Sequence, residues 1–237
     1  MTTTAAATTL DTSQTLRANE KKKELSKCLH ELKLNDTLSK DQMVLVLGQW
    51  FHPLHYFPTF LSRLIAVTPQ VRTQTFVSRI LWEELGKGDP QSAHEKIYIE
   101  TITAGGFAAS DVAEAPPLPA TERLVAGYEK ASSGPLSGLG FLYGTEVMDL
   151  QMVSTIGDLM RRCTGKQDLP WVNVHVDQEP GHVESSESSI RPVLTAEEQT
   201  EVVRSAEEMW ALWTDFFKAV NDKIASRHWS LSSKLIC

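Results

Sequence analysis

The sequence predicts an all-α protein that folds as a single bundle of about seven helices. Long segments carry apolar residues at helical spacing, and Ser, Thr, Pro and Gly residues mark where these segments begin and end. Strand-like alternation occurs only around residues 171–176, and no tandem repeat is visible. A chain of 237 residues with 41% hydrophobic and 22% charged residues has the size and composition of one globular domain.

The N-terminal region divides into a tail and the start of the domain. Residues 1–15, rich in Thr and Ala, are predicted to form a loose tail, and residues 16–237 a single helical domain. Within residues 16–34, apolar residues recur at helical spacing and predict the first helix. Its basic run, residues 21–23, is predicted to be a solvated helix face.

A long apolar helix follows. Ser39 and Gln42 have the spacing of a capping box, in which each residue satisfies a backbone N–H group of the other. The helix that they begin is predicted to extend to about Ala66. Pro53 and Pro58 are expected to kink it, because proline cannot donate the helical hydrogen bond.

Two helices joined by a glycine-rich link come next. Residues 70–85 predict a helix that ends at Gly-Lys-Gly, residues 86–88. Asp89 has the character of an N-cap and Pro90 that of a first-turn residue, so another helix is predicted to run to about Ile102.

The C-terminal half predicts four more helices. Their ranges are 116–131, 134–162, 171–187 and 195–224. The third is ambiguous because it begins with strand-like residues, but we expect it to be helical, since tertiary packing overrides intrinsic propensity. The fourth is amphipathic, with Thr195 as its cap and Glu198 three residues later.

Composition excludes several classes of function. Lys and Arg total 23 against 30 Asp and Glu, a net charge of −7, so neither nucleic acid nor an anionic membrane is expected as a partner. No apolar stretch approaches the roughly 18 residues of a membrane span, and no signal segment is visible, so a cytoplasmic location is expected. Three widely spaced cysteines form neither a disulfide framework nor a zinc pattern.

The most informative segment contains His175, Glu179 and His182. On a helix, offsets of four and seven residues place these three side chains on one face, where they suit iron, manganese or zinc. Residues 167–190 contain five acidic residues and no Lys or Arg. A buried carboxylate there would need a compensating charge, which a bound cation can supply. The alternative is an acidic solvated face with two incidental histidines.

Two further segments carry candidate ligands. Glu146 lies in a mostly apolar helix without a cation between residues 131 and 160, so it would be costly to bury unless a metal ion were bound; the alternative is that it faces outward with Asp149. Glu84 ends one helix and His94 lies near the start of the next, so the two can converge. The alternative is that both are exposed polar residues.

The order of these residues along the chain resembles the ligand pattern of the heme-oxygenase-like diiron oxidases and oxygenases. The order is Glu84 with His94, then Glu146, then His175, Glu179 and His182. The resemblance covers residues 40–225. It implies a heme-oxygenase-like bundle in which four helices supply three carboxylates and three histidines to two O2-activating Fe(II) ions. These six residues are then both the metal ligands and the catalytic residues.

The resemblance also implies a partition of the ligands, with Glu84, His94 and His182 towards one iron and the other three towards the second. The chain departs from the family where Glu179 replaces the usual Asp and where residues 180–181, Pro-Gly, predict a kink or bulge. Asp177 is therefore an alternative to Glu179, and Glu83 an alternative to Glu84.

The implied reaction is a biosynthetic oxidation of a small amino-acid-type or other carboxylate substrate: N-oxygenation, desaturation or oxidative carbon–carbon cleavage. Fatty-acid decarboxylation is the alternative within the family. O2 and a small molecule are the expected partners, while an external electron donor and a homodimer are left open. Candidate pocket, mouth and anchor residues are Trp82, Phe141, Tyr143, Trp171, His52, His55, Arg72, Arg79 and Arg161.

Two rival functions remain at this point. One is a true heme oxygenase, with His30 as the axial ligand and the glycine-rich residues 134–140 as a flexible distal helix. The other is a non-catalytic helical binding protein whose acidic and histidine residues are surface features.

The link before His94 also predicts a dynamic segment. Two glycines flank Lys87, and the helix that follows has few apolar residues. We therefore expect residues 88–105 to be mobile without metal, whereas Glu84 stays in place.

Overall fold

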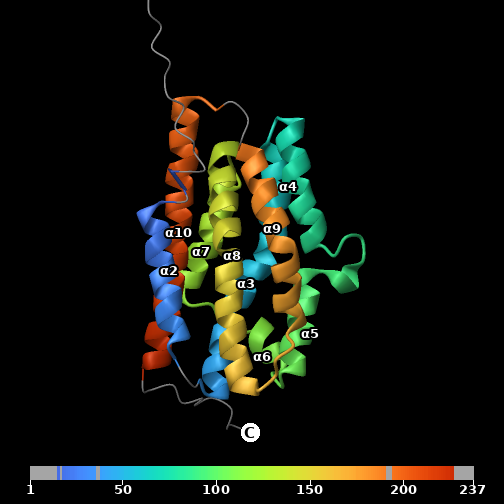
Figure 1. Cartoon of the computed structure of the whole chain (residues 1–237), viewed down its shortest axis with the longest axis vertical. Coiled ribbons are helices and arrows are strands. Elements are labelled where there is room, and N and C mark those ends of the chain that lie inside the picture. The colour runs from blue at the N-terminus through green and yellow to red at the C-terminus, as the bar shows by residue number, and fades with distance from the viewer. Residues whose placement is uncertain (1–14, 17, 36–37, 191–193, 227–237) are drawn as a thin grey trace, which may run out of the picture.

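The computed structural model describes residues 15–16, 18–35, 38–190 and 194–226, and all regular secondary structure in these residues is helical (Figure 1). Nine α-helices and one 3-10 turn are present there, so the all-α prediction is confirmed. Their bounds are α2 Glu20–Lys33, α3 Lys40–Val67, α4 Val71–Glu84, η1 Pro90–Ser92, α5 His94–Ala104, α6 Ala109–Ala113, α7 Pro119–Ala131, α8 Pro135–Thr164, α9 Pro170–Ile190 and α10 Ala196–Ala225. Most of the predicted tail, residues 1–14, lies outside the described residues.

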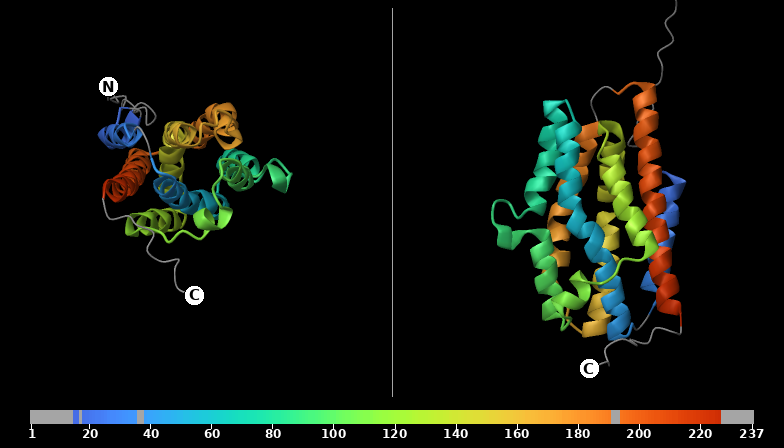
Figure 2. Two further views of the ribbon diagram at one scale, coloured as in Figure 1. Left: turned by 90° about the horizontal axis from the view of Figure 1, so that it is seen from below. Right: turned by 180° about the vertical axis from the view of Figure 1, so that it is seen from behind.

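The long helices run along the long axis of the molecule (Figure 1). α8 packs against α10, α9 and α2, and α4 packs against both α9 and α3. Seen from the end, α8 and α9 lie side by side, with α4 and α5 beyond α9 and with α2 and α10 on the other side (Figure 2). α9 is therefore placed between the central helix α8 and the outer pair α4 and α5.

Capping residues begin the helices where the sequence predicts. Ser39 and Gln42 form a capping box at α3, and Thr195 and Glu198 form one at α10. α8 ends at Gly165, whose φ of 73° places it in the left-handed region that glycine adopts without strain.

The glycine-rich start of α8 allows two helices to approach closely. A Cβ atom on Gly140 would lie 2.4 Å from the carbonyl oxygen of Val202 on α10. Trp210, also on α10, donates a hydrogen bond of 2.8 Å from its indole nitrogen to the carbonyl oxygen of Gly144. These glycines are thus contact points of the α8–α10 interface, which positions the residues that follow on α8.

The prolines predicted to kink or interrupt helices lie inside them. α3 continues through Pro53 and Pro58, and α9 remains α-helical through Pro180. Pro180 leaves the carbonyl of Val176 without its helical donor, but the Val176 side chain is 50% exposed, so that this face of the helix is open to water. Of the kink or bulge predicted near residues 176–181, the bulge is absent, because the helix is continuous there.

The segment between α4 and α5 differs from its prediction. Asp89 is an N-cap, since its carboxylate accepts a hydrogen bond from the backbone N–H of Gln91, but the element that it caps is a single 3-10 turn. α5 itself begins only at His94. α6 was not predicted, since its five residues are too few to show a periodicity.

The core is continuous and aromatic. Trp50 of α3 lies against both Trp171 of α9 and Trp213 of α10, at ring-centroid distances of 5.9 and 5.2 Å. Tyr98 of α5 is buried and donates a 2.7 Å hydrogen bond to the Leu47 carbonyl oxygen. None of the described helices has an apolar segment long enough to cross a bilayer.

Candidate metal centre

The inward face of α9 carries the three residues that the helical spacing predicts. His175, Glu179 and His182 are each no more than 6% exposed. Asp177, the alternative to Glu179, points to the exposed side of the helix. Of the two acids, Glu179 is therefore the one on the buried face with both histidines, as the 3.6-residue period requires.

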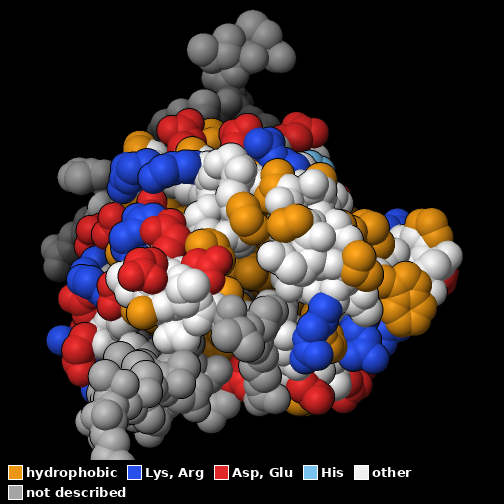
Figure 3. Space-filling view, turned by 90° about the horizontal axis from the view of Figure 1, so that it is seen from above, with side chains coloured by type: hydrophobic (Ala, Val, Ile, Leu, Met, Phe, Trp, Pro, Cys, Tyr) orange, Lys and Arg blue, Asp and Glu red, His pale blue; other side chains and the backbone are white. Residues whose placement is uncertain are grey.

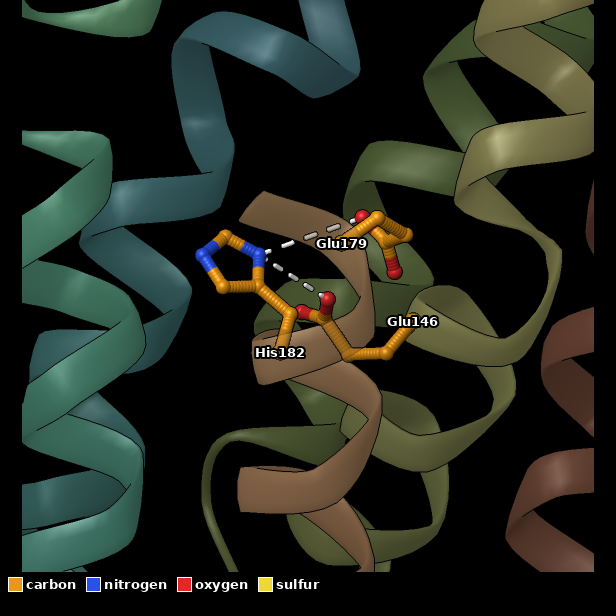
Figure 4. A group of neighbouring side chains, drawn as sticks. All are labelled: Glu146, Glu179 and His182. Atoms are coloured by element: carbon orange, nitrogen blue, oxygen red, sulfur yellow. Dashed lines mark ion pairs between the residues drawn. The ribbon is translucent and has the colours of Figure 1, made fainter. Parts of the chain in front are cut away.

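Glu146 of α8 faces these α9 residues and is 2% exposed. Its Oε2 atom lies 3.3 Å from Nδ1 of His182, and Oε2 of Glu179 lies 3.9 Å from the same nitrogen (Figure 4). One donor atom from each of the three residues falls within 4.8 Å of the other two. Two donors about 2.1 Å from a shared ion are about 3.0 to 4.2 Å apart, so this group suits one metal ion.

Glu84 and His94 complete the predicted set from α4 and α5. Oε2 of Glu84 lies 3.0 Å from Nδ1 of His94, and its Oε1 lies 4.0 Å from Nδ1 of His182. The His94 ring is 4.7 Å from the His175 ring. The six residues predicted from sequence are therefore brought together from four helices.

The distances do not favour the predicted partition of these ligands. Nδ1 of His182 is nearer to Glu146 than to Glu84, at 3.3 against 4.0 Å. His182 thus lies nearer to Glu146 than to Glu84, while the His94 ring lies beside the His175 ring. The division of the six residues between two ions stays a prediction.

The predictions missed Asp149, although it is one helical turn after Glu146. Its side chain is 16% exposed, and Oδ2 lies 3.8 Å from Nε2 of His175. Asp149 and Glu179 are also close enough to affect each other's pKa. The three-residue spacing from Glu146 was the signal that places both acids on one face.

Glu83 lies at the edge of the centre. Its Oε2 atom is 3.5 Å from Nε2 of His182 and also 3.5 Å from Nζ of Lys87. Its side chain is 25% exposed, against 11% for Glu84. Glu84 is therefore the inner residue of the pair, and Glu83 joins the centre to the link that follows α4.

The chemistry of this donor set fits metal ions. Glu146 Oε1, Asp149 Oδ2 and Glu179 Oε1 are buried and accept no hydrogen bond from an N–H or O–H group. In the part of the chain that the structure describes, no Lys or Arg forms an ion pair with these three residues. Buried carboxylates with unused oxygens and no cationic side chain are costly unless a cation binds there.

Burial and neighbouring charges shift the pKa values of the cluster in different directions. Burial raises the pKa of Glu179 well above its usual range, with Asp149 and Glu146 adding to the effect, and burial also raises the pKa of Glu146. Burial alone would raise the pKa of Glu84, but His94 outweighs it and lowers that pKa to about 2. Burial would lower the pKa of His182, but Glu146 and Glu84 raise it to about 9.

The histidine rings are oriented by neighbours outside the cluster. Nδ1 of His175 lies 2.7 Å from the carbonyl oxygen of Trp171, so Nδ1 carries the proton and donates it to this oxygen. Nε2 of His175 is then the nitrogen with a free lone pair, and it faces the carboxylates. Nε2 of His94 lies 3.3 Å from Oε1 of Gln178, which leaves Nδ1 towards Glu84.

Residues 44–214 match the family model described as iron-containing redox enzyme. The chain belongs to this family. The match contains all six predicted ligands and Asp149. A search of curated proteins found no match.

Several solved structures share the fold of this iron-containing redox enzyme family member. A Cadd-like protein of unknown function from Nostoc punctiforme superposes with a TM-score of 0.76 at 15% identity, over 91% of this chain and 96% of that one. A domain of unknown function with a heme oxygenase-like fold from Shewanella denitrificans gives 0.70 at 19% identity, over 92% and 94%. A TenA homolog from Pseudomonas syringae pv. tomato gives 0.61 at 11% identity, over 90% and 88%. The predicted heme-oxygenase-like fold is confirmed, and at these identities the likeness extends to the fold alone.

A cavity opens beside the metal centre of this family member. Its volume is about 40 Å³, counted as the space that the centre of a water molecule can occupy. Its lining combines ligand-cluster residues with an aromatic and apolar wall: Glu84, Glu146, Asp149, His175, His182, Thr145, Tyr128, Trp50, Pro53, Leu54, Phe57 and Trp213. No Lys or Arg is among these lining residues.

The pocket residues proposed from sequence lie elsewhere. Trp82 is 54% exposed, near the C-terminal end of α4. Seen from above, the surface of the bundle carries hydrophobic side chains among charged ones, so an exposed aromatic residue there marks no pocket (Figure 3). Phe141, Tyr143 and Trp171 are core residues that do not line the cavity. The wall comes from α3, α7 and α10 instead, which sequence spacing could not relate to the ligands.

The proposed mouth and anchor residues are also placed elsewhere. Nε2 of His52 lies 2.9 Å from the carbonyl oxygen of Ala115, and His55 pairs with Glu95 on the surface. The arginines, Arg72, Arg79 and Arg161, are absent from the lining.

The heme oxygenase alternative has no support in the geometry. His30 is exposed on α2, whereas an axial ligand has to face a pocket. The glycine-rich start of α8 is packed against α10, so it does not form a flexible distal helix.

Proposed function

We propose that this protein is a non-heme diiron oxidase or oxygenase that activates O2. The observation that carries the proposal is the buried cluster in which carboxylates and histidines from four helices converge. Among the described residues, no Lys or Arg forms an ion pair with Glu146, Asp149 or Glu179. Family membership in the iron-containing redox enzymes supports the choice of iron. Mixed nitrogen and oxygen donors suit Fe(II).

The residues of the cluster would divide into two binding groups. Glu146, Glu179 and His182 would hold one ion, and His175, His94 and Glu84 the other. When bound, two adjacent ferrous ions supply the electrons that reduce O2. The Trp171 carbonyl keeps His175 in the tautomer that presents Nε2 to the ion.

The cavity wall would exclude water and position the substrate. Trp50, Phe57 and Trp213 provide an aromatic surface, and the hydroxyl groups of Tyr128 and Thr145 lie 2.9 Å apart beside it. An aromatic wall beside the metal ions would keep water away from the reacting atoms of the substrate.

The cavity also bears on the substrate class. A substrate carboxylate finds no Lys or Arg among the lining residues and would depend on the metal ions, whereas an apolar side chain would pack on the aromatic wall. A small amino acid with an apolar side chain meets both conditions. A biosynthetic oxidation of such an amino acid is therefore the proposed reaction.

Anaerobic loading with Fe(II) tests the proposal. We expect two iron ions per chain and O2 consumption that rises when apolar amino acids are supplied. His55→Ala is the matched control, because His55 is an exposed histidine outside the cavity. A wild-type protein that binds one ion or none at saturating Fe(II) would rule out the diiron proposal.

A further inference from the structure

We propose that Asp149 is a seventh protein ligand of the metal centre, bound to the same ion as His175. This assignment rests on the proposed dinuclear centre and adds a residue that the ligand pattern of the family does not contain. Asp149 lies on α8 one turn after Glu146, so the two carboxylates project from the same helix towards α9.

The side of the His175 ring that Asp149 faces supports direct ligation. Nδ1 of His175 donates to the Trp171 carbonyl oxygen, so its proton points away from the cluster. Asp149 Oδ2 lies 3.8 Å from the other nitrogen, Nε2. An outer carboxylate that orients a ligating histidine would instead contact the nitrogen that carries the proton. Two lone-pair atoms that face each other at this distance leave room for an ion between them, since donors on one ion are about 3.0 to 4.2 Å apart.

The unpaired carboxylate oxygens of Asp149 and Glu179 provide the second observation. The two buried groups are close enough to affect each other's pKa. Asp149 Oδ2 and Glu179 Oε1 accept no hydrogen bond from another group. Such a pair is stable only if the two share a proton or a cation, because two adjacent buried carboxylates repel each other. Glu179 also belongs to the group around His182. A cation at Asp149 would therefore be adjacent to that group.

Charge balance agrees with this assignment. Glu84, Glu146 and Glu179 supply three negative charges, which leave one positive charge in excess when two Fe(II) ions bind. Asp149 supplies the fourth negative charge, and no described Lys or Arg pairs with it. A centre with Asp149 as a ligand is neutral without an anion from the substrate, which agrees with a cavity that has no basic lining residue.

Mn(II) titration of the apo protein tests the assignment without an activity assay. Asp149→Asn keeps the shape of the side chain and removes its charge, Asp149→Glu keeps the charge, and Asp177→Asn is the matched control on the exposed side of α9. We expect two Mn(II) ions in wild type and in Asp177→Asn, with the electron paramagnetic resonance spectrum of a spin-coupled pair. In Asp149→Asn, the second ion should bind at least about tenfold more weakly, and the spectrum at equal loading should be that of a single ion. Asp149→Glu should recover the coupled spectrum.

The apo melting temperature separates a ligand from a structural residue. Asp149→Asn should melt at or above the wild-type temperature without metal, because one of several neighbouring buried carboxyl groups is removed, and should gain less from added Mn(II). Two Mn(II) ions bound by Asp149→Asn with wild-type affinity and a coupled spectrum would overturn the assignment and leave the diiron proposal intact. A wild-type protein that binds fewer than two ions would overturn the diiron proposal itself and this assignment with it.

Discussion

The candidate metal centre combines two unlike pairs of helices. α8 and α9 are 30 and 21 residues long, pack against each other within the core and present Glu146, His175, Glu179 and His182. α4 and α5 are 14 and 11 residues long and present Glu84 and His94. The link between them, residues 86–88, has positive φ at all three positions, which costs free energy at Lys87 because it has a Cβ atom. One side of the centre is therefore preformed by packing, whereas His94 depends on a short helix with a strained connection.

The structure also narrows the segment expected to move. Only His94, Tyr98, Thr101 and Ile102 are buried in α5. Tyr98 and Thr101 are tied to the core, since Tyr98 donates to the Leu47 carbonyl oxygen and Thr101 accepts from the backbone N–H of Trp171. The first turn of α5 has His94 as its buried contact. Metal-dependent mobility is thus expected at residues 86–97, a shorter segment than the sequence predicts.

The largest effect should follow from removing a ligand on the preformed side. His182→Ala removes the nitrogen that contacts Glu146 and Glu179, so one iron site and all turnover should be lost, and His175→Ala should act in the same way. Iron stoichiometry and O2 consumption measure both effects. His55→Ala should retain two iron ions and full turnover. Full activity in either ligand variant would contradict the proposed centre.

Hydrogen exchange should separate the two helix pairs directly. On loading both irons, exchange in residues 86–97 should slow by about tenfold or more, because a metal–nitrogen bond then holds the first turn of α5. α10, residues 196–225, should change little, and His94→Ala should abolish the slowing. Equal protection from exchange with and without metal would mean that packing alone holds residues 86–97. The two helix pairs would then not differ in their dependence on metal.

The pH dependence should have opposite signs with and without metal. The pKa of His182 is raised to about 9 in the folded apo protein, so its stabilising contribution is complete below about 6.5 and is lost as the pH rises through about 9. The raised pKa values of Glu146 and Glu179 act in the same direction, since their ionisation above the usual range destabilises the fold. The free energy of unfolding of the apo protein should therefore fall from pH 6.5 to 9, while Mn(II) affinity rises because the ligands lose their protons. Denaturant titrations and calorimetry check the two trends, and parallel trends would contradict them.

Substitutions of the two acidic residues of α9 should have smaller effects, which separate the role of side-chain length from that of charge. Glu179→Asp keeps the carboxylate and should weaken metal binding less than Glu179→Ala does. Asp177→Ala, on the exposed side, should change the free energy of unfolding by no more than about 0.5 kcal/mol and leave metal stoichiometry unchanged. A severe Asp177→Ala defect with a mild Glu179→Ala defect would reverse the assignment of the two acids.

Much of the centre was predictable because it follows helical periodicity. The offsets between His175, Glu179 and His182 place them on one face whatever the rest of the fold does. Helix ends were predictable for a similar reason, since capping residues such as Ser39 and Thr195 act on their own backbone within one turn. These features depend on residues close in sequence, and the structure confirms them.

Some features of the candidate site depend on which helix lies opposite, and only the tertiary structure decided them. α8 has apolar residues on nearly all sides, so its sequence defines no inward face, and only packing against α9 turns Glu146 and Asp149 towards His182 and His175. The same holds for the cavity wall, where Trp50 and Trp213 come from helices far apart in the chain. Local spacing determines which side chains share a face, but contacts between distant helices determine what that face meets.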